Sequence, residues 1–182
     1  MSPLAVLVGA PGSGKSTVGR RAAEQLGCTF ADTDALIEQV AGMSVSDIFV
    51  NLGEPEFRAL EEQTVADAIT HQNGIVSLGG GAIVSARTRE RLADVDVIWL
   101  RVSLQDAAQR VGMNTARPLL LGNVRGKLSS LMSDREPLYR QAARATIDTS
   151  GRKVREVVSD VVSLIGDWQA DRAAKAGDAD HG

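Results

Sequence analysis

The chain has 182 residues, of which 43% are hydrophobic and 24% are charged, and its formal net charge is -3 at pH 7. These values are typical of one compact domain, and they exclude bulk attraction to nucleic acid or to an anionic membrane. The single cysteine, Cys28, excludes an intrachain disulfide framework. Because the sequence has no long apolar span and no signal segment, we expect a cytoplasmic monomer with small-molecule partners, and neither nucleic acid nor membrane among them.

The first predicted strand leads into a phosphate-binding loop. Residues 4–8 form an apolar run typical of a buried strand, and residues 9–17, GAPGSGKST, fit the pattern G-x-x-x-x-G-K-[ST]. In this pattern glycines let backbone N–H groups face a polyphosphate, the lysine neutralises its oxygens, and the following hydroxyl reaches Mg²⁺. A glycine-rich turn that matches by chance is the alternative, but the flanking strand and helix favour a nucleotide-binding site. The residues predicted to bind the nucleotide here are Gly12, Ser13, Gly14, Lys15, Ser16 and Thr17.

Strands and helices alternate along the rest of the chain. Further strands are predicted at residues 28–31, 75–78, 95–102 and 145–147, and helices at about 16–26, 55–69 and 154–168. The alternation predicts a three-layer α/β/α fold with a central five-stranded parallel sheet covered on both faces. We expect a single P-loop kinase domain over residues 1–168. Residues 169–182, rich in alanine, aspartate and glycine, are expected to form a disordered tail.

Two carboxylates, Asp32 and Asp34, follow the second predicted strand. They lie near the phosphate loop if this strand is adjacent to the first. Alternate side chains of extended backbone share a face, so both carboxylates face the phosphates unless the chain has already turned into a helix. The alternative role is helix capping, and we expect one of the two to cap. Because the strand ending at Leu78 has no acidic end, Asp32 is the predicted metal ligand together with Ser16.

Two glycine-containing segments depart from the alternation. Gly79, Gly80 and Gly81 follow the strand ending at residue 78, at the sheet edge where open α/β folds bind ligands. Close approach of a substrate is favoured there over a merely flexible turn. Residues 112–122 carry a glycine at either end, a proline and a central arginine, Arg117, and this composition predicts a mobile lid.

Together these motifs resemble those of the shikimate kinases, small P-loop kinases of the nucleoside-monophosphate-kinase type, and the proportions are closest to actinobacterial members. The resemblance extends from residue 5 to about residue 165. It implies ATP- and Mg²⁺-dependent phosphorylation of the 3-hydroxyl of shikimate, giving shikimate 3-phosphate and ADP on the route to chorismate and the aromatic amino acids. It rests on residues 9–17, 32–34, 53–58, 79–81, 117–119 and 135–139.

The resemblance also implies catalytic roles. Asp34 contacts the acceptor hydroxyl as the base, and Lys15 and the mobile Arg117 act on the transferring phosphoryl group. Asp32 holds Mg²⁺ through water beside the direct ligand Ser16. The acceptor-binding region is expected over about residues 33–62.

Acceptor and adenine contacts follow from the same resemblance. Arg58 and Arg135 bind the substrate carboxylate, a task suited to a planar guanidinium. Glu61 lies one helical turn from Arg58 and can pair with it. Arg110 and Arg152 border adenine, with a surface salt bridge as the alternative for each. The remaining predicted acceptor contacts are Pro11, Phe49, Phe57, Leu119 and the three glycines Gly79, Gly80 and Gly81.

Two other functions stay open from the residues alone. One is another small-molecule P-loop kinase, for gluconate or a nucleoside monophosphate. Arg58 and Arg135 favour an acidic acceptor, but gluconate is also a carboxylate. The other is a nucleotide-dependent switch, which would hydrolyse ATP slowly whether or not an acceptor is present; Lys15, Asp34 and Arg117 argue against it.

Overall fold

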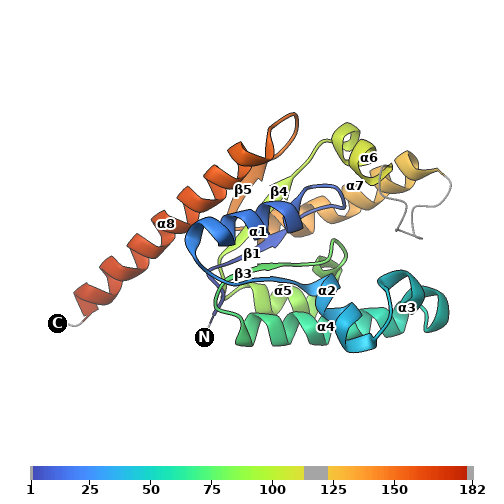
Figure 1. Cartoon of the computed structure of the whole chain (residues 1–182), viewed down its shortest axis with the longest axis horizontal. Helices are drawn as coiled ribbons and strands as arrows, with labels where there is room; N and C mark the ends of the chain where they lie inside the picture. Colours follow the sequence, from blue (N-terminus) through green and yellow to red (C-terminus); the bar gives the residue numbers. More distant parts are fainter. Residues whose placement is uncertain (1, 113–122, 180–182) are drawn as a thin grey trace.

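A parallel sheet of five strands forms the centre of the molecule (Figure 1). The computed structural model describes residues 2–112 and 123–179. The strands pair in the order β2-β3-β1-β4-β5, and each neighbouring pair is parallel. The predicted apolar runs form these strands because a parallel sheet is covered on both faces. The strands are β1 (Ala5–Val8), β2 (Phe30–Asp32), β3 (Ile75–Ser77), β4 (Val97–Arg101) and β5 (Ala145–Asp148).

Helices cover both faces of the sheet, which confirms the predicted three-layer α/β fold. Alternate strand residues point to opposite faces: Leu7 and Ile98 pack under α1 and α8, whereas Val76 and Trp99 pack under α4, α5 and α7. Of the helices described, none is long and apolar enough to cross a membrane. The helices are α1 (Lys15–Leu26), α2 (Thr33–Ala41), α3 (Val45–Asn51), α4 (Glu54–His71), α5 (Ala86–Leu92), α6 (Leu104–Gly112), α7 (Val124–Ala142), α8 (Val154–Ala179) and the short 3-10 helix η1 (Ala82–Val84).

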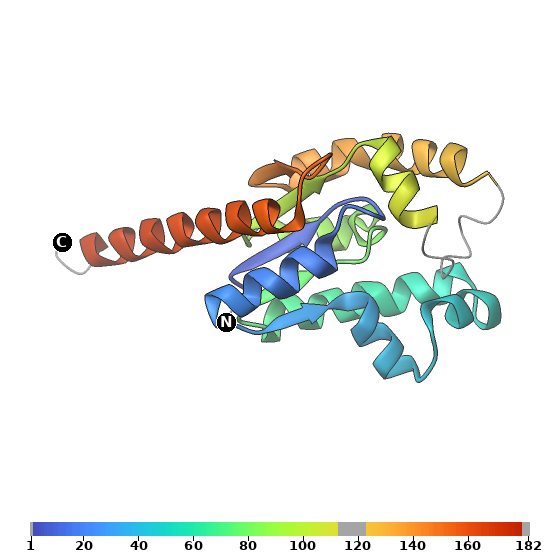
Figure 2. The same cartoon turned by 45° about the horizontal axis from the view of Figure 1, so that its top comes forward.

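The carboxyl edge of the sheet brings distant parts of the chain together. β3 lies between β1 and β2, so β1 and β2 are not adjacent. The prediction that Asp32 lies near the phosphate loop assumed that they were. Leu7 and Asp32 nevertheless both pair with Ser77, so β1 and β2 end at the same level. Figure 2 shows α6 and α7 on one side of this edge and α2 and α3 on the other. Open α/β sheets bind ligands at this kind of edge.

The prediction of a disordered tail from residue 169 is wrong as far as Ala179, because α8 continues to that residue. Its last turns extend past the sheet (Figures 1 and 2). Alanine, arginine and lysine are strong helix formers, which favours continuation. Arg172 also anchors the helix, with its Nη1 2.6 Å from Asp96 Oδ2. Residues 180–182 lie outside the described part of the chain.

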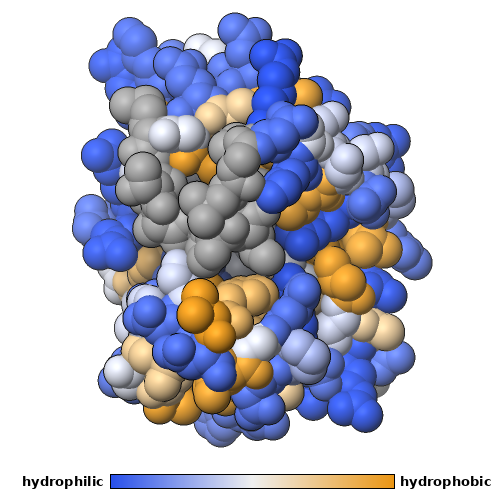
Figure 3. Space-filling view, turned by 90° about the vertical axis from the view of Figure 1, so that its right-hand side faces the viewer, coloured by the Kyte–Doolittle hydropathy of each residue, from blue (hydrophilic) through white to orange (hydrophobic). Residues whose placement is uncertain are grey.

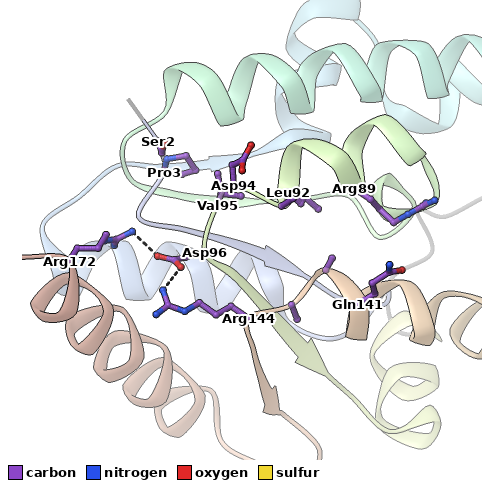
Figure 4. Close-up of a pocket in the computed structure, with 13 residues that line it drawn as sticks. Ser2, Pro3, Arg89, Leu92, Asp94, Val95, Asp96, Gln141, Arg144 and Arg172 are labelled. Carbon is purple, nitrogen blue, oxygen red and sulfur yellow. Dashed lines mark hydrogen bonds and ion pairs between the residues drawn. The ribbon is translucent and has the colours of Figure 1, made fainter. Parts of the chain in front are cut away.

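Asp96 is the centre of this anchor, beside a hollow at the amino edge of the sheet (Figure 4). Its carboxylate also accepts a hydrogen bond from Arg144. The guanidinium of Arg144 in turn lies over the ring of Trp168, 4.5 Å from its centroid. One carboxylate thus joins the start of β4 to the residue before β5 and to α8.

Asp96→Asn is expected to lower the free energy of unfolding by about 1–3 kcal/mol, because a neutral amide cannot replace a shielded carboxylate that two guanidinium groups share. The Asp96 side chain is only 12% exposed, whereas that of Arg172 is 48% exposed. Arg172→Ala is therefore expected to cost less than about 1 kcal/mol. Urea unfolding followed by circular dichroism measures both. Equal losses in the two variants would contradict the central role of Asp96.

Candidate active site

The phosphate loop is preformed between β1 and α1. Gly12 and Gly14 have φ angles of +79° and +88°, in the region that favours glycine, and they let the backbone turn tightly. Lys15 is buried, and its Nζ donates to the carbonyl oxygens of Gly9 at 2.9 Å and Ala10 at 3.2 Å. A cation is thus held inside a ring of backbone groups, as a polyphosphate site requires.

Ser16 and Asp32 meet across two elements. Ser16 Oγ donates to Asp32 Oδ2 at 2.5 Å, and Asp32 Oδ1 accepts from the backbone N–H of Asp34 at 3.1 Å. Asp32 therefore caps α2, which confirms that one carboxylate of the pair is a cap. The chain has already turned at Thr33, so the two carboxylates are not alternate residues of a strand.

The Ser16–Asp32 pair fits a magnesium ion. Hydroxyl and carboxylate oxygens are hard ligands, and Mg²⁺ commonly completes its octahedron with waters and substrate phosphates. Within residues 2–112 and 123–179, no group of three or more His, Cys, Asp or Glu side chains could hold a metal ion. The hydroxyl and carboxylate of the pair suit a cation that arrives with a nucleotide, whose phosphates supply further oxygen ligands.

The glycines after β3 let side chains approach the backbone closely. The Gly79 N–H donates to the buried Thr33 Oγ1 at 3.0 Å. A β-carbon on Gly79 would overlap the carboxylate of Asp34 and lie 2.9 Å from Glu61 Oε1, and one on Gly81 would overlap the guanidinium of Arg58. At Gly79 and Gly81 the side chains of Asp34 and Arg58 thus occupy the space that a β-carbon would take.

Arg58 and Glu61 form the ion pair predicted from their spacing on one helix. Arg58 Nη1 lies 2.6 Å from Glu61 Oε2, and Arg58 Nη2 lies 3.3 Å from Glu54 Oε1. The side chain of Glu61 is almost fully buried, whereas that of Arg58 is partly open. Burial raises the pKa of the Glu61 carboxyl, and Arg58 opposes this rise. The pair holds a guanidinium at the edge of the glycine segment.

After Lys15 of the phosphate loop and Arg58 of α4, a third cationic side chain of the site comes from α7. Arg135 Nη1 donates to the carbonyl oxygen of Gly80 at 2.9 Å. Tyr139 donates its hydroxyl to the same oxygen at 2.6 Å. The sequence motif contains Tyr139, but no role was predicted for it; its position one helical turn after Arg135 was the available signal.

The apolar residues predicted to border the acceptor lie in different parts of the structure. Phe57 is buried in a small core between α2, α3 and α4, and its ring lies 4.5 Å from that of Phe49, centroid to centroid. Pro11 is buried at the phosphate loop, and a β-carbon on Gly80 would lie 3.1 Å from its Cδ. Figure 3 shows this end of the molecule, where apolar and polar side chains are mixed over the surface. Leu119 lies outside the described residues.

Arg110 and Arg152, both predicted to border adenine, make different contacts. Arg110 Nη1 donates to the carbonyl oxygen of Gly12 at 3.0 Å, so this arginine braces the phosphate loop. Arg152 Nη1 lies 2.8 Å from Asp160 Oδ2, which is the salt bridge considered as its alternative role. The predicted lid, residues 112–122, falls outside the described residues except for Gly112, which ends α6. Arg117 falls outside with it.

Comparison with known proteins gives consistent matches. The family model "SKI: Shikimate kinase" matches residues 11–166. The shikimate kinase of Thermobifida fusca is 55% identical over 148 residues, which cover 81% of this chain and 86% of that protein. The shikimate kinase of Mycobacterium avium is 49% identical over 175 residues, covering 96% and 99%. The solved shikimate kinase from Acinetobacter baumannii in complex with shikimate superposes with a TM-score of 0.86 at 36% identity, covering 91% and 93%.

Proposed function

The chain belongs to the shikimate kinase family, and from that premise we propose how its residues divide the work of the reaction. The enzyme transfers a phosphoryl group from ATP to shikimate. The observation that carries the site assignment is the meeting of two arginines and a carboxylate at the glycine segment, next to the phosphate loop. Arg58, Arg135 and Asp34 each reach one of the three glycines, and Gly80 lies against Pro11.

The phosphate loop binds the nucleotide. The N–H groups from Gly12 to Thr17 face the phosphates, and the Lys15 ammonium moves from loop carbonyls toward the β and γ oxygens. Ser16 and Asp32 would hold Mg²⁺, the first directly and the second through water; when bound, the ion neutralises charge on the phosphates. Arg110 keeps the loop in shape near the adenine, whereas Arg152 is engaged in its salt bridge with Asp160.

Asp34 acts at the acceptor. It accepts a hydrogen bond from the 3-hydroxyl of shikimate and orients this oxygen in line with the γ-phosphorus. It takes the proton as the new oxygen–phosphorus bond forms and the bond from the γ-phosphorus to the bridging oxygen breaks, so that ADP leaves. Asp34 lies in the first turn of α2, two residues after the Asp32 cap. Its carboxylate lies beside Gly79, two residues after the end of β3, which supports this role.

Arg58 and Arg135 bind the shikimate carboxylate, and Glu61 keeps Arg58 in place. The apolar side chains Phe49, Phe57, Pro11 and Leu119 border the ring. Arg117, from the proposed lid, reaches the transferring phosphoryl group and helps to exclude water. A carboxylate anchored at one end of the ring leaves the ring hydroxyls at the phosphate side.

The pH dependence of acceptor binding is expected to reflect Glu61. Since burial raises its pKa, the folded protein binds this proton at a higher pH than the unfolded chain does, and the Glu61 contribution to stability increases as pH falls through the raised pKa. The same protonation weakens the hold on Arg58, so the shikimate KM should rise several-fold over that range. Steady-state kinetics at decreasing pH measure this rise. Glu61→Gln should have a raised KM already at neutral pH and a flat profile, whereas an unchanged profile would contradict the assignment.

The direct test of the function is consumption of Mg²⁺-ATP by the purified protein with shikimate, gluconate, AMP or no acceptor, with the product identified by mass. Turnover with shikimate alone, giving its 3-phosphate, supports the proposal. Turnover with gluconate or AMP would keep the phosphate-loop chemistry and overturn the acceptor site. Hydrolysis that does not depend on an acceptor would indicate a nucleotide-dependent switch.

A further inference from the structure

The carbonyl oxygen of Gly80 accepts two hydrogen bonds from one helix. Arg135 Nη1 donates at 2.9 Å and the Tyr139 hydroxyl at 2.6 Å. A carbonyl oxygen has two lone pairs, so both donors can be accommodated. Arg135 and Tyr139 are four residues apart, on the same face of α7, and both reach across to the segment after β3.

Tyr139 and Arg135 differ in how freely their side chains can move. Tyr139 is 2% exposed, and its ring stacks on Trp99 of β4 with centroids 6.0 Å apart. Burial raises the pKa of its hydroxyl to about 12, so the group stays a donor throughout the neutral range. Arg135 is only half-buried and carries a charge suited to a carboxylate. One donor is fixed, therefore, and the other can change partner.

We propose that Tyr139 is a positioning residue of the acceptor site, which holds the Gly80 carbonyl while Arg135 leaves it to bind the shikimate carboxylate. The inference rests on the proposed role of Arg135. Without Tyr139, the departure of Arg135 would leave a partly buried carbonyl with no protein donor, and this loss would weaken shikimate binding. With Tyr139, the glycine segment keeps its place when the substrate enters.

The segment is already fixed on its other side, which sharpens the role of Tyr139. The Gly79 N–H is bound by Thr33, and the Gly81 backbone lies against Arg58. Gly80 is the residue between these two supports, and its carbonyl depends on α7. A shift of this peptide would move the glycine segment that Asp34, Arg58 and Arg135 all approach.

Tyr139→Phe is the first experiment, because it removes the hydroxyl and keeps the ring on Trp99. The shikimate KM is expected to rise about five- to tenfold, with kcat and the ATP KM within about twofold of wild type, since a hydrogen bond that matters when the acceptor binds is lost. Thr88→Val is the matched control. It also deletes a buried hydroxyl, one whose Oγ1 has no hydrogen-bond partner among the described residues, and it should leave the shikimate KM unchanged.

A second measurement uses the wild-type protein. Tyr139 is the single tyrosine of the chain, so incorporation of 3-fluorotyrosine gives one ¹⁹F resonance from its ring. Shikimate should shift this resonance, because Arg135 leaves the shared carbonyl and the Tyr139 hydrogen bond becomes the sole one. No shift at saturating shikimate would overturn the inference, even if the phenylalanine variant failed to fold.

Arg135→Lys separates the inference from the function on which it rests. A raised shikimate KM in Arg135→Lys together with a wild-type KM in Tyr139→Phe would keep the carboxylate role of Arg135 and overturn that of Tyr139. A wild-type shikimate KM in Arg135→Lys would overturn both. A raised KM in both variants, with an unchanged Thr88→Val enzyme, supports the two roles together.

Discussion

Asp34→Asn is expected to lower kcat by about 10²- to 10⁴-fold and to change shikimate affinity far less, because the amide fills the same space but does not take a proton. The backbone of Asp34 is held in place by the Asp32 cap, and its carboxylate lies against Gly79. The substitution therefore leaves the geometry of the site close to that of the wild type. Steady-state kinetics with varied shikimate, together with equilibrium binding of shikimate, measure the two effects separately.

Arg58→Ala is the informative contrast to Asp34→Asn. It removes a group assigned to the substrate carboxylate, so its main effect should be a large rise in shikimate KM.

If Asp34→Asn kept its kcat, Asp34 would not be the base. A loose phosphoryl-transfer transition state demands little proton abstraction. A loss near the lower end of the range would therefore indicate that Asp34 mainly orients the hydroxyl.

The sequence predicts the fold well wherever local patterns decide it. Buried strands read as apolar runs, and glycine, lysine and serine at fixed spacing identify the phosphate loop. Local patterns do not predict the order of the strands in the sheet. The position of β3 between β1 and β2 depends on long crossovers, which leave no local pattern. The end of α8 was also missed: helix propensity and the contact of Arg172 with Asp96 outweigh a polar composition.

In the candidate site, too, contacts between residues close in sequence could be predicted, whereas contacts between distant residues could not. The Arg58–Glu61 pair is three residues apart on one helix, and the Asp32 cap is local, so both follow from spacing. Tyr139 meets Gly80 from a residue 59 positions away. Such contacts are set by how α7 packs on the sheet, and a single sequence contains no measure of that packing.

Lys15→Ala is expected to lower turnover by at least about 10²- to 10³-fold, because it removes the cation assigned to the phosphates. It should also weaken ATP binding, since the ammonium acts on the nucleotide before and during transfer. ATP turnover with shikimate present and nucleotide binding by calorimetry measure the two effects. Lys175→Ala, at an exposed position late in α8, is the control for loss of one positive charge and should keep wild-type activity.

The reason to expect so large an effect lies in the buried position of Lys15. Its ammonium is 2.9 Å from the Gly9 carbonyl oxygen and 3.2 Å from that of Ala10, inside the loop that surrounds the phosphates. A charge shielded from water acts more strongly on a nearby phosphate than an exposed charge does. Near-normal turnover in Lys15→Ala would mean that backbone N–H groups and the metal ion neutralise the phosphates without it. The burial of Lys15 would then serve to hold the loop closed, and the variant should instead lose thermal stability.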